Sequence, residues 1–479
     1  MTGGPSRPTE SKEKTGKQSK AIDSLAILPL ENASGDPETE YLSDGIAETL
    51  INTLAQLRKI RVVPRAVAFQ YRGPGVNPLT AGRELGVRTV LAGRMVQRGN
   101  DLIVSLELVD VDRQGQLWGG RFNRRMTDLI ALQEELATEI YEKLRLQLSG
   151  EDKKNLRKRP TQNNEAYRLL LRAQHCFQNE YPAGLPKAVS FCQQAVEKDP
   201  LYAPAYAELA GTYVELNAIG MAPASEVLPL ARRAARKAIE LDETLGEAHI
   251  SLGLLYAHDW DFAASARELR RGLELSPDSP RGNYRLTQTH WSRGRLEEAI
   301  VSARRFAEVD PGSWIPNFML GTTFYFAGAY DEAITEYHKA IRLDPQNPQT
   351  SALLADTYAC AGQKAAALEQ CERVLVQASG VQVLVLHVAA TYALLGKIAE
   401  AREILDEAER KWRSGDASAV WIAGAHARLG DRDLAFEWLD RAVQEHELYL
   451  LFLRMHRFME SLRGDPRFDA LVKRIGLPD

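Results

Sequence analysis

The sequence has few of the features that mark secreted, membrane or nucleic-acid-binding proteins. Four cysteines in 479 residues are too few for a disulfide framework, so we expect a reducing compartment, by default the cytoplasm. No apolar run approaches the roughly 20 residues that span a bilayer. No basic domain or stripe offers contacts to phosphates, so no nucleic acid is expected as a partner. Residues 1–20 are polar, which predicts a disordered tail and no secretory signal.

Sequence motifs of common enzymes are also missing. The P-loop, dinucleotide-binding, zinc-protease and nucleophile-elbow patterns and the kinase triplets do not occur. The Gly-rich stretch 71–77 has no following lysine, which favours a surface turn over a phosphate loop. His175 and Cys176 do not stand at metal-ligand spacing from Cys192, which favours packing over a metal site. We therefore predict no catalytic, cofactor-binding or metal-binding residues and no cofactor.

One stretch, "NASGDPETEYLSDGIAETL" at 32–50, still resembles an enzyme loop because it joins an apolar run to a helical pattern. Its acidic residues are Asp36, Glu38, Glu40 and Asp44. They suit a helix N-terminus but oppose phosphate binding, and the loop contains no lysine or arginine. Ser34 has no histidine within the loop to activate it, and the acids lack EF-hand spacing for Ca²⁺. We predict a capped strand-to-helix turn, and recognition of a ligand or partner stays open.

A repeat of 34 residues dominates the second half of the chain. Its glycines are Gly294, Gly328, Gly362, Gly396 and Gly430. The alanines five residues after each glycine are Ala299, Ala333, Ala367, Ala401 and Ala435. The glycine tolerates the left-handed backbone that ends a helix, and the alanine fits where two helices approach closely. Prolines that stop the second helix recur at the same spacing, so the pattern predicts antiparallel helix pairs.

This pattern resembles the tetratricopeptide repeat (TPR) family. Copies can be placed at 164–198, 203–240, 246–276, 280–310, 314–344, 348–378, 382–412 and 416–446. Trp260 and Ser265 replace the glycine and alanine of the third copy, which leaves its pairing open. Stacked pairs form a solenoid whose first helices line a concave groove for peptides or partner helices. Residues 447–479 break the register, and we expect them to form helices that cap the last repeat.

The resemblance implies which positions face the groove, and from these we predict the partner-binding site. The candidate residues are Tyr284, Gln288, Trp291, Phe318, Tyr325 and Asp356. The Lys, Arg and Asn pattern that holds a peptide carboxylate in some family members is missing, so we expect an apolar partner anchored on aromatic side chains. The alternative is that these aromatic side chains pack between neighbouring repeats.

Residues 21–150 predict a separate α/β domain with the order βαβαβββα. The expected elements are strands at 24–30 and 60–65, helices at 40–59 and 77–87, a hairpin at 88–111, a strand at 116–124 and a helix from Thr127 or Asp128. Gly99-Asn100 is a strong hairpin turn signal. Residues 151–162 form a charged linker, for which solvation is favoured over a nucleic-acid or lipid contact. The fold class is thus a small α/β domain followed by a solenoid of about eight TPR pairs at 163–446.

The stretches "SLAILPLENASGDPETEYLSDGIAETL" and "LWGGRFNR" are similar to the TolB-like N-terminal α/β domain. In that family the domain precedes TPR arrays and commonly follows a serine/threonine kinase, a class III adenylate cyclase or a winged-helix DNA-binding domain. The sequence contains none of these effectors. We therefore expect a non-enzymatic scaffold or adaptor of bacterial signalling that binds a protein partner in its groove. The alternative is the regulatory half of a kinase, cyclase or winged-helix system acting on a separately encoded or once-fused effector. A third hypothesis is a hydrolase with an unrecognised site in 21–150.

Overall fold

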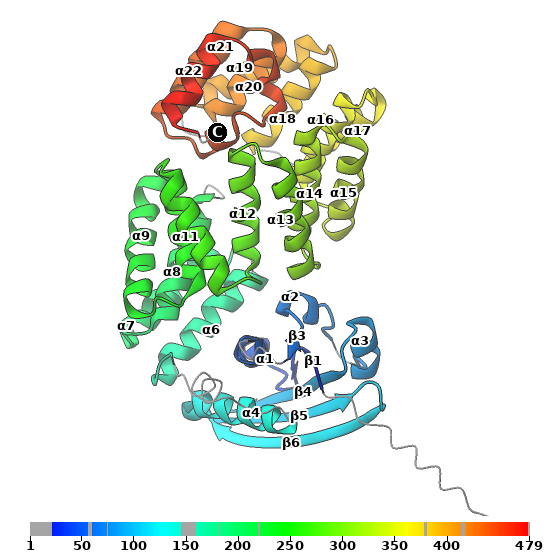
Figure 1. Ribbon diagram of the computed structural model, residues 1–479, viewed down its shortest axis with the longest axis vertical. Coiled ribbons are helices and arrows are strands. Elements are labelled where there is room, and N and C mark those ends of the chain that lie inside the picture. Colours follow the sequence, from blue (N-terminus) through cyan, green and yellow to red (C-terminus); the bar gives the residue numbers. More distant parts are fainter. Residues whose placement is uncertain are drawn as a thin grey trace, which may run out of the picture.

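The computed structural model describes residues 22–477, except 56–59, 74, 145–159, 181, 219–220, 378–380 and 413–416. The predicted tail at 1–20 and most of the predicted linker therefore lie outside the described residues. The described residues form a small sheet domain followed by a curved array of helix pairs (Figure 1). This arrangement is the predicted fold class.

The sheet domain is built from six strands and the short helices between them. Its elements are β1 (Ser24–Ile27), β2 (Glu31–Asn32), η1 (Pro37–Thr39), α1 (Glu40–Ala55), β3 (Arg61–Val62), α2 (Arg65–Ala68), α3 (Pro78–Glu84), β4 (Thr89–Arg98), β5 (Asp101–Asp110), β6 (Gly115–Arg125), η2 (Met126–Asp128) and α4 (Leu129–Lys143). The strand order is β3-β1-β4-β5-β6, and β2 also pairs with β4. The first three of these strands are parallel, and β4, β5 and β6 are antiparallel.

Both faces of the sheet are covered where β1 and β4 lie. Leu25 and Ile27 pack into a core shared with α1 and α4, whereas Ala26 packs with residues of α2 and α3 on the other face. This alternation is the period of two that a pleated strand imposes. Arg98 pairs with Asp101 across the predicted hairpin turn, and Gly99 has φ +56°. The two elements that the sequence did not predict, β2 and α2, have only two and four residues.

The helical array consists of eight antiparallel pairs and a C-terminal segment. The pairs are α6 (Asn164–Asn179) with α7 (Leu185–Lys198), α8 (Ala203–Ala218) with α9 (Ala224–Leu241), α10 (Gly246–His258) with α11 (Phe262–Leu275), α12 (Pro280–Ser292) with α13 (Leu296–Val309), α14 (Ile315–Ala327) with α15 (Tyr330–Leu343), α16 (Pro348–Cys360) with α17 (Lys364–Gln377), α18 (Gln382–Leu394) with α19 (Ile398–Trp412), and α20 (Ala419–Leu429) with α21 (Arg432–Gln444). After them come η3 (Leu448–Phe452), η4 (Arg457–Leu462) and α22 (Pro466–Ile475).

The repeat-defining residues occupy the positions that the spacing predicts. The five glycines have φ between +68° and +85°, the left-handed conformation that ends the first helix of each pair. The five alanines are fully buried, at 0% exposure. In the third pair Trp260 takes the glycine's place with φ +61°, and Ser265 is buried in the alanine's place. The third pair therefore keeps the repeat geometry despite both replacements.

The sheet domain packs against the first helix of the array. Gly45 of α1 lies so close to α6 that an added Cβ would meet the Leu171 side chain at 2.8 Å. The Tyr167 hydroxyl donates to Gln133 Oε1 at 2.5 Å and lies 2.9 Å from Thr49 Oγ1. Asn164 Oδ1 accepts from the Ile130 backbone N–H at 3.0 Å and so caps α4 across the junction. Among the described helices, none is both long enough and apolar enough to cross a bilayer.

Candidate partner-binding groove

The candidate groove is formed by the first helices of the pairs, which lie side by side along the array. Each first helix from α8 to α20 contacts the next, in the order α8, α10, α12, α14, α16, α18 and α20. Small residues allow this approach: an added Cβ at Gly282 of α12 would meet Ile250 Cδ1 of α10 at 2.9 Å. Side chains from successive first helices therefore line one continuous surface.

The structure places four of the six predicted groove residues in the interior. Trp291 is 4% exposed, Phe318 7%, Tyr325 1% and Asp356 0%. Tyr284 and Gln288 remain partly exposed, and the Gln288 amide donates to the Tyr284 hydroxyl at 3.1 Å. All six residues lie on first helices. In this conformation a partner can reach Tyr284 and Gln288 of α12 but not the four buried residues.

Residues 448–462 cover the groove, and we call them the tail segment. The Phe452 ring meets the Trp291 ring edge-on, with centroids 5.8 Å apart. The Phe458 ring lies 5.6 Å from Trp421 and 5.3 Å from His387. The tail segment thus spans first helices from α12 to α20 and fills the surface that they share.

Polar contacts also hold the tail segment. Arg457 Nη2 donates to the Phe326 carbonyl oxygen at 3.3 Å, and its guanidinium lies 5.7 Å from the Tyr330 ring centroid. Ser461 Oγ donates to the Ala427 carbonyl oxygen at 2.8 Å. The last carbonyls of a helix lack partners within the regular helix, and the tail segment donates hydrogen bonds to such helix-end carbonyls of α14 and α20.

The apolar anchors of the tail segment are deeply buried. Those with at most 2% exposure are Leu450, Leu453, Phe458, Met459 and Leu462. Burying one such side chain is worth roughly 1.5–3 kcal/mol. The tail segment therefore does not leave the groove unaided, and any partner has to replace its contacts.

Asp356 has structural partners beneath the tail segment. It accepts hydrogen bonds from the Tyr325 hydroxyl and from Arg428 Nη2, the latter at 3.2 Å. Burial raises the pKa of Tyr325 well above its usual value, and the neighbouring Asp356 raises it further. Burial would lower the pKa of Arg428, but Asp356 and Tyr325 outweigh it and keep the guanidinium charged. This pairing compensates the buried carboxylate.

Two histidines are buried at the same interface. Burial first, and then His387 and Arg463, lower the pKa of His456 to about 3. Burial also lowers the pKa of His387, whose Nδ1 lies 2.8 Å from the Val383 carbonyl oxygen. Both imidazoles are therefore neutral near pH 7, and their rings pack as aromatic groups against Trp421.

The C-terminal region continues the repeat further than we predicted from the sequence. Gly464 stands 34 residues after Gly430 and has φ +89°. α22 contacts α21, and Arg467 Nη1 lies 2.8 Å from Asp433 Oδ1, again 34 positions earlier. The last repeat thus keeps a second helix, while two short 3₁₀ turns take the place of its first helix.

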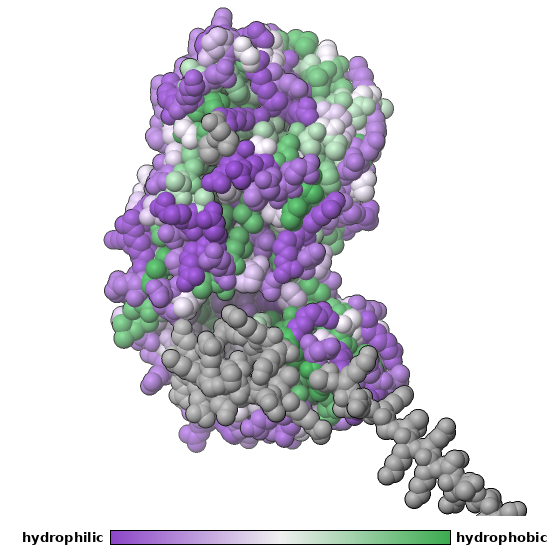
Figure 2. Space-filling model, viewed as in Figure 1, coloured by the Kyte–Doolittle hydropathy of each residue, from purple (hydrophilic) through white to green (hydrophobic). Residues whose placement is uncertain are grey.

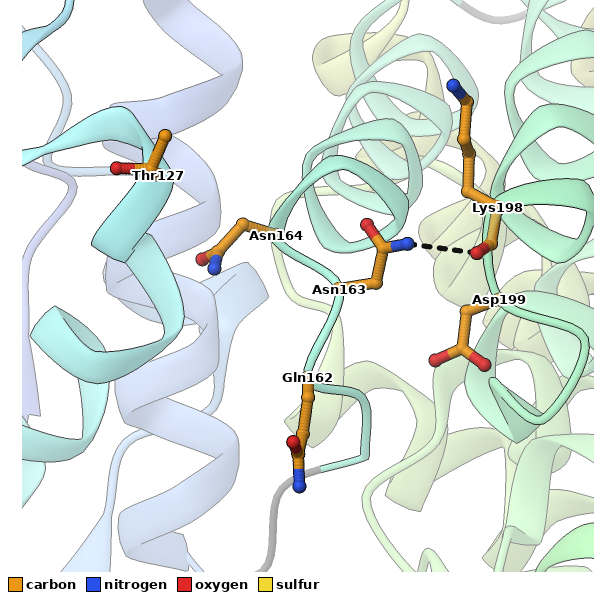
Figure 3. A pocket seen from close by; sticks show the side chains of 6 residues that line it. All are labelled: Thr127, Gln162, Asn163, Asn164, Lys198 and Asp199. Atoms are coloured by element: carbon orange, nitrogen blue, oxygen red, sulfur yellow. Dashed lines mark hydrogen bonds between the residues drawn. The ribbon is translucent and has the colours of Figure 1, made fainter.

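A second surface feature lies at the domain junction. It is a shallow polar recess lined by Thr127, Gln162, Asn163, Asn164, Lys198 and Asp199 (Figure 3). The Asn163 amide donates to the Lys198 carbonyl oxygen at 2.9 Å, and Asn163 Oδ1 caps α6. Thr161 Oγ1 donates to Asp199 Oδ2 at 2.5 Å. These polar groups hold the chain in place between α4 and α6.

Hydrogen bonds within the loop at 32–50 and to neighbouring segments hold the loop in place. Asp36 Oδ1 accepts from the Glu38 backbone N–H at 3.0 Å, which is the predicted cap. Ser34 Oγ accepts from the Gln97 backbone N–H at 2.8 Å. Asp44 Oδ1 accepts from Arg72 Nη2 at 2.5 Å, and Asp44 Oδ2 lies 3.5 Å from His175 Nδ1. In the part of the chain that the structure describes, no three His, Cys, Asp or Glu side chains are arranged to hold a metal ion.

Family models match both regions of the chain. Residues 19–139 match a model described as the HilA/YgeH-like transcriptional regulator, second domain. Residues 321–362 match a TPR repeat model, and residues 252–313 and 392–448 match a tetratricopeptide repeat model. The C-terminal region therefore contains TPR repeats. The model that matches the N-terminal region differs from the TolB-like resemblance of the sequence.

A curated relative and several solved structures are similar to parts of the chain. "Putative adenylate cyclase 3" of Rhizobium meliloti (strain 1021) is 31% identical over 236 residues, which is 48% of this chain and 40% of the relative. The chain thus matches less than half the length of that relative.

The structural neighbours include YrrB, a TPR protein with an unusual peptide-binding site, with 19% identity, a TM-score of 0.30 and coverage of 39% of this chain and 91% of that one. The type IV pilus biogenesis factor PilW has 18% identity, a TM-score of 0.38 and coverage of 44% and 94%. The human IFIT1 dimer with PPP-AAAA has 13% identity, a TM-score of 0.43 and coverage of 67% and 83%. All three TM-scores lie below 0.5, so these likenesses carry no argument about what this chain binds.

Proposed function

We propose that this protein is a non-enzymatic interaction scaffold of bacterial signalling that binds a partner segment in the concave groove of its TPR repeats. One observation carries the proposal: the groove already holds a segment of the chain itself, built of two 3₁₀ turns, through aromatic rings and helix-end carbonyls. A surface that accepts one such segment has the shape and chemistry to accept another. We also propose a cytoplasmic location, which fits the four free cysteines.

The six predicted groove residues remain the proposed site, with two different roles. Tyr284 and Gln288 are partly exposed and offer the first contact to an arriving partner. Trp291, Phe318 and Tyr325 lie among the buried side chains, so they take part after the tail segment has moved. Asp356 contributes through its pairing with Arg428, which holds α16 and α20 together.

A second candidate function is the regulatory half of an effector system. The likeness to a curated protein named as an adenylate cyclase favours a cyclase as the effector. The match of residues 19–139 to a domain of transcriptional regulators favours a DNA-binding effector instead. The TolB-like resemblance of residues 21–150 agrees with either effector and with a kinase. In each case the TPR groove would receive a segment of the effector or of a protein that controls it.

The proposed function is tested by affinity purification of the full-length chain from its native cell, with the bound proteins identified by mass spectrometry. The double variant Trp291→Ala/Tyr325→Ala should lose its partner. The matched control is Phe436→Ala, which truncates a buried aromatic side chain on the second helix α21, where Arg467 covers the ring at 4.1 Å. A partner that binds the groove variant as well as the wild type would contradict the groove assignment. A cyclase, kinase or DNA-binding regulator among the retained proteins would favour the second candidate.

A further inference from the structure

The groove contains two aromatic subsites, each defined by the phenylalanine of the tail segment that it contacts. The first is formed by Trp291, whose ring meets Phe452 edge-on at 5.8 Å and stands edge-on to Phe326 at 5.3 Å. The second is formed by His387 and Trp421, 4.1 Å apart, and it receives Phe458. The two bound phenylalanines are six residues apart in the sequence.

The second subsite is shaped to admit a ring. An added Cβ at Gly424 would lie 3.1 Å from Phe458 Cβ, which is tighter than normal van der Waals contact, and 3.5 Å from its Cδ2 atom. Because glycine stands at this position of α20, the Phe458 ring can lie directly against the helix backbone. Any side chain at position 424 would compete with the bound ring for this space.

A cation is held between the two subsites. Arg457 immediately precedes Phe458, and it contacts both the Phe326 carbonyl oxygen and the Tyr330 ring face. The carbonyl stands at the C-terminal end of α14, where the helix dipole favours positive charge. The groove therefore selects for a positive side chain next to the second aromatic residue.

The tail segment is attached to the array at both ends by contacts outside the groove. α21 lies before it, and after it α22 is tied to α21 by Arg467–Asp433 at 2.8 Å and Arg474–Asp440 at 2.6 Å. α22 also buries Phe468 and Ile475. The segment can therefore leave the groove as a loop while the helices on both sides stay in place.

We propose that the groove binds an external protein segment with two aromatic side chains six residues apart and an arginine or lysine immediately before the second. The tail segment is the resident competitor for that site. This inference rests on the proposed function and specifies the chemistry of the partner. A tethered segment has an effective concentration on the order of millimolar, so it outcompetes an external segment until its own anchors are weakened.

The test measures the binding of a fluorescently labelled synthetic peptide of residues 447–463 to the full-length chain by anisotropy. We expect the peptide to bind the variant Phe452→Ala/Phe458→Ala at least tenfold more tightly than the wild type. The matched control is Phe468→Ala, which truncates a buried phenylalanine of α22 that lies outside the groove. It should bind the peptide no better than the wild type, and a peptide without its two phenylalanines should bind none of the proteins.

Circular dichroism reports whether the double variant is folded. If the double variant is not folded, the variant Phe458→Leu takes its place, because leucine keeps most of the apolar volume of phenylalanine. Equal binding to all three proteins, or no binding to a folded double variant, would overturn the inference. If the peptide does not bind the double variant, but a partner is purified with the wild type and lost from Trp291→Ala/Tyr325→Ala, the inference fails and the proposed function stands. If that partner also binds Trp291→Ala/Tyr325→Ala as well as the wild type, both fail.

Discussion

At the residue scale, Trp260 shows how strongly the repeat imposes its backbone. It stands 34 residues before Gly294 and adopts φ +61°, a backbone conformation that residues other than glycine rarely take. Its ring stacks on His446 with centroids 4.4 Å apart, and this contact helps to hold the strained residue. The packing of the third helix pair therefore overrides the local preference of tryptophan.

Replacing Trp260 by glycine or by alanine separates the backbone strain from the ring contact. Both variants lose the stacked ring, but only glycine relieves the left-handed conformation. We expect Trp260→Gly to be more stable than Trp260→Ala by about 1 kcal/mol in urea unfolding. Equal stability of the two variants would show that the backbone is not strained at this position.

Asp44 is a buried carboxylate whose charge depends on neighbours from two regions of the chain. Burial alone would raise its pKa, but hydrogen bonds from His175 and Arg72 outweigh burial and hold the pKa below its usual value. A lowered pKa means that the ionised carboxylate stabilises the fold above about pH 4, and that this stability is lost as the pH falls further.

We expect Asp44→Asn to lower the free energy of unfolding by about 2 kcal/mol at pH 7, because it removes one partner of a buried ion pair. The difference from the wild type should shrink as the pH falls below about 4. The control is Glu40→Gln, which alters a more exposed partner of the same Arg72 and should cost less than about 0.5 kcal/mol. A difference that stays constant down to pH 2 would contradict this account of Asp44.

At the element scale, Asn163 and Asn164 are adjacent residues that cap different helices. Asn163 caps α6, its own helix, whereas Asn164 reaches across the junction to the first turn of α4. Each cap is worth about 1 kcal/mol. In site-resolved hydrogen exchange, Asn164→Ala should speed exchange in the first turn of α4, and Asn163→Ala in the first turn of α6. The opposite pattern, or faster exchange in both helices from either change, would contradict the assignment.

The close contact between α20 and η4 gives a second prediction at this scale. Gly424→Ala forces the Phe458 side chain away from the helix backbone, which should cost about 1–3 kcal/mol of stability. The control is Gly115→Ala, where the nearest heavy atom to an added Cβ is 3.8 Å away. Urea midpoints that fall equally for both variants would show that the tail segment does not press on α20.

The elements differ in how far the sequence could predict them. The helix pairs are predictable because Gly294 and its counterparts adopt a left-handed backbone that glycine favours. A glycine therefore recurs at this position every 34 residues in the sequence. The hairpin is predictable because Gly99 and Asn100 suit a two-residue turn. β2 and α2 are too short to show a periodicity.

The path of the tail segment was beyond sequence reasoning for a different reason. Phe452, Phe458 and Leu462 are residue types that a capping helix would also bury, so composition does not distinguish the two arrangements. Their contacts with Trp291 and Trp421 join positions far apart in the chain, and 3₁₀ turns have no long period. Only Gly464, 34 residues after Gly430, signalled that the repeat continues.

At the scale of the whole molecule, the chain covers its own candidate binding surface with the tail segment, and the sheet domain packs on the array as well. The tail segment fills the groove of the later repeats, and the sheet domain approaches the middle of the array, where Gln70 lies 3.0 Å from an added Cβ at Gly312. The face of the molecule seen in the space-filling view is mostly hydrophilic, with smaller apolar patches among the hydrophilic side chains (Figure 2). Binding in the groove therefore requires a rearrangement within the chain.

The central claim is that the tail segment occupies a binding groove, and it is tested most directly on the unmodified full-length protein. Hydrogen exchange of residues 448–462 would be followed by mass spectrometry with and without an excess of an isotope-labelled 447–463 peptide. We predict faster exchange of the resident tail segment as the peptide replaces it, while α14 and α20 stay protected. Unchanged exchange of residues 448–462, at peptide concentrations at which anisotropy shows the wild type itself to be saturated, would contradict the account.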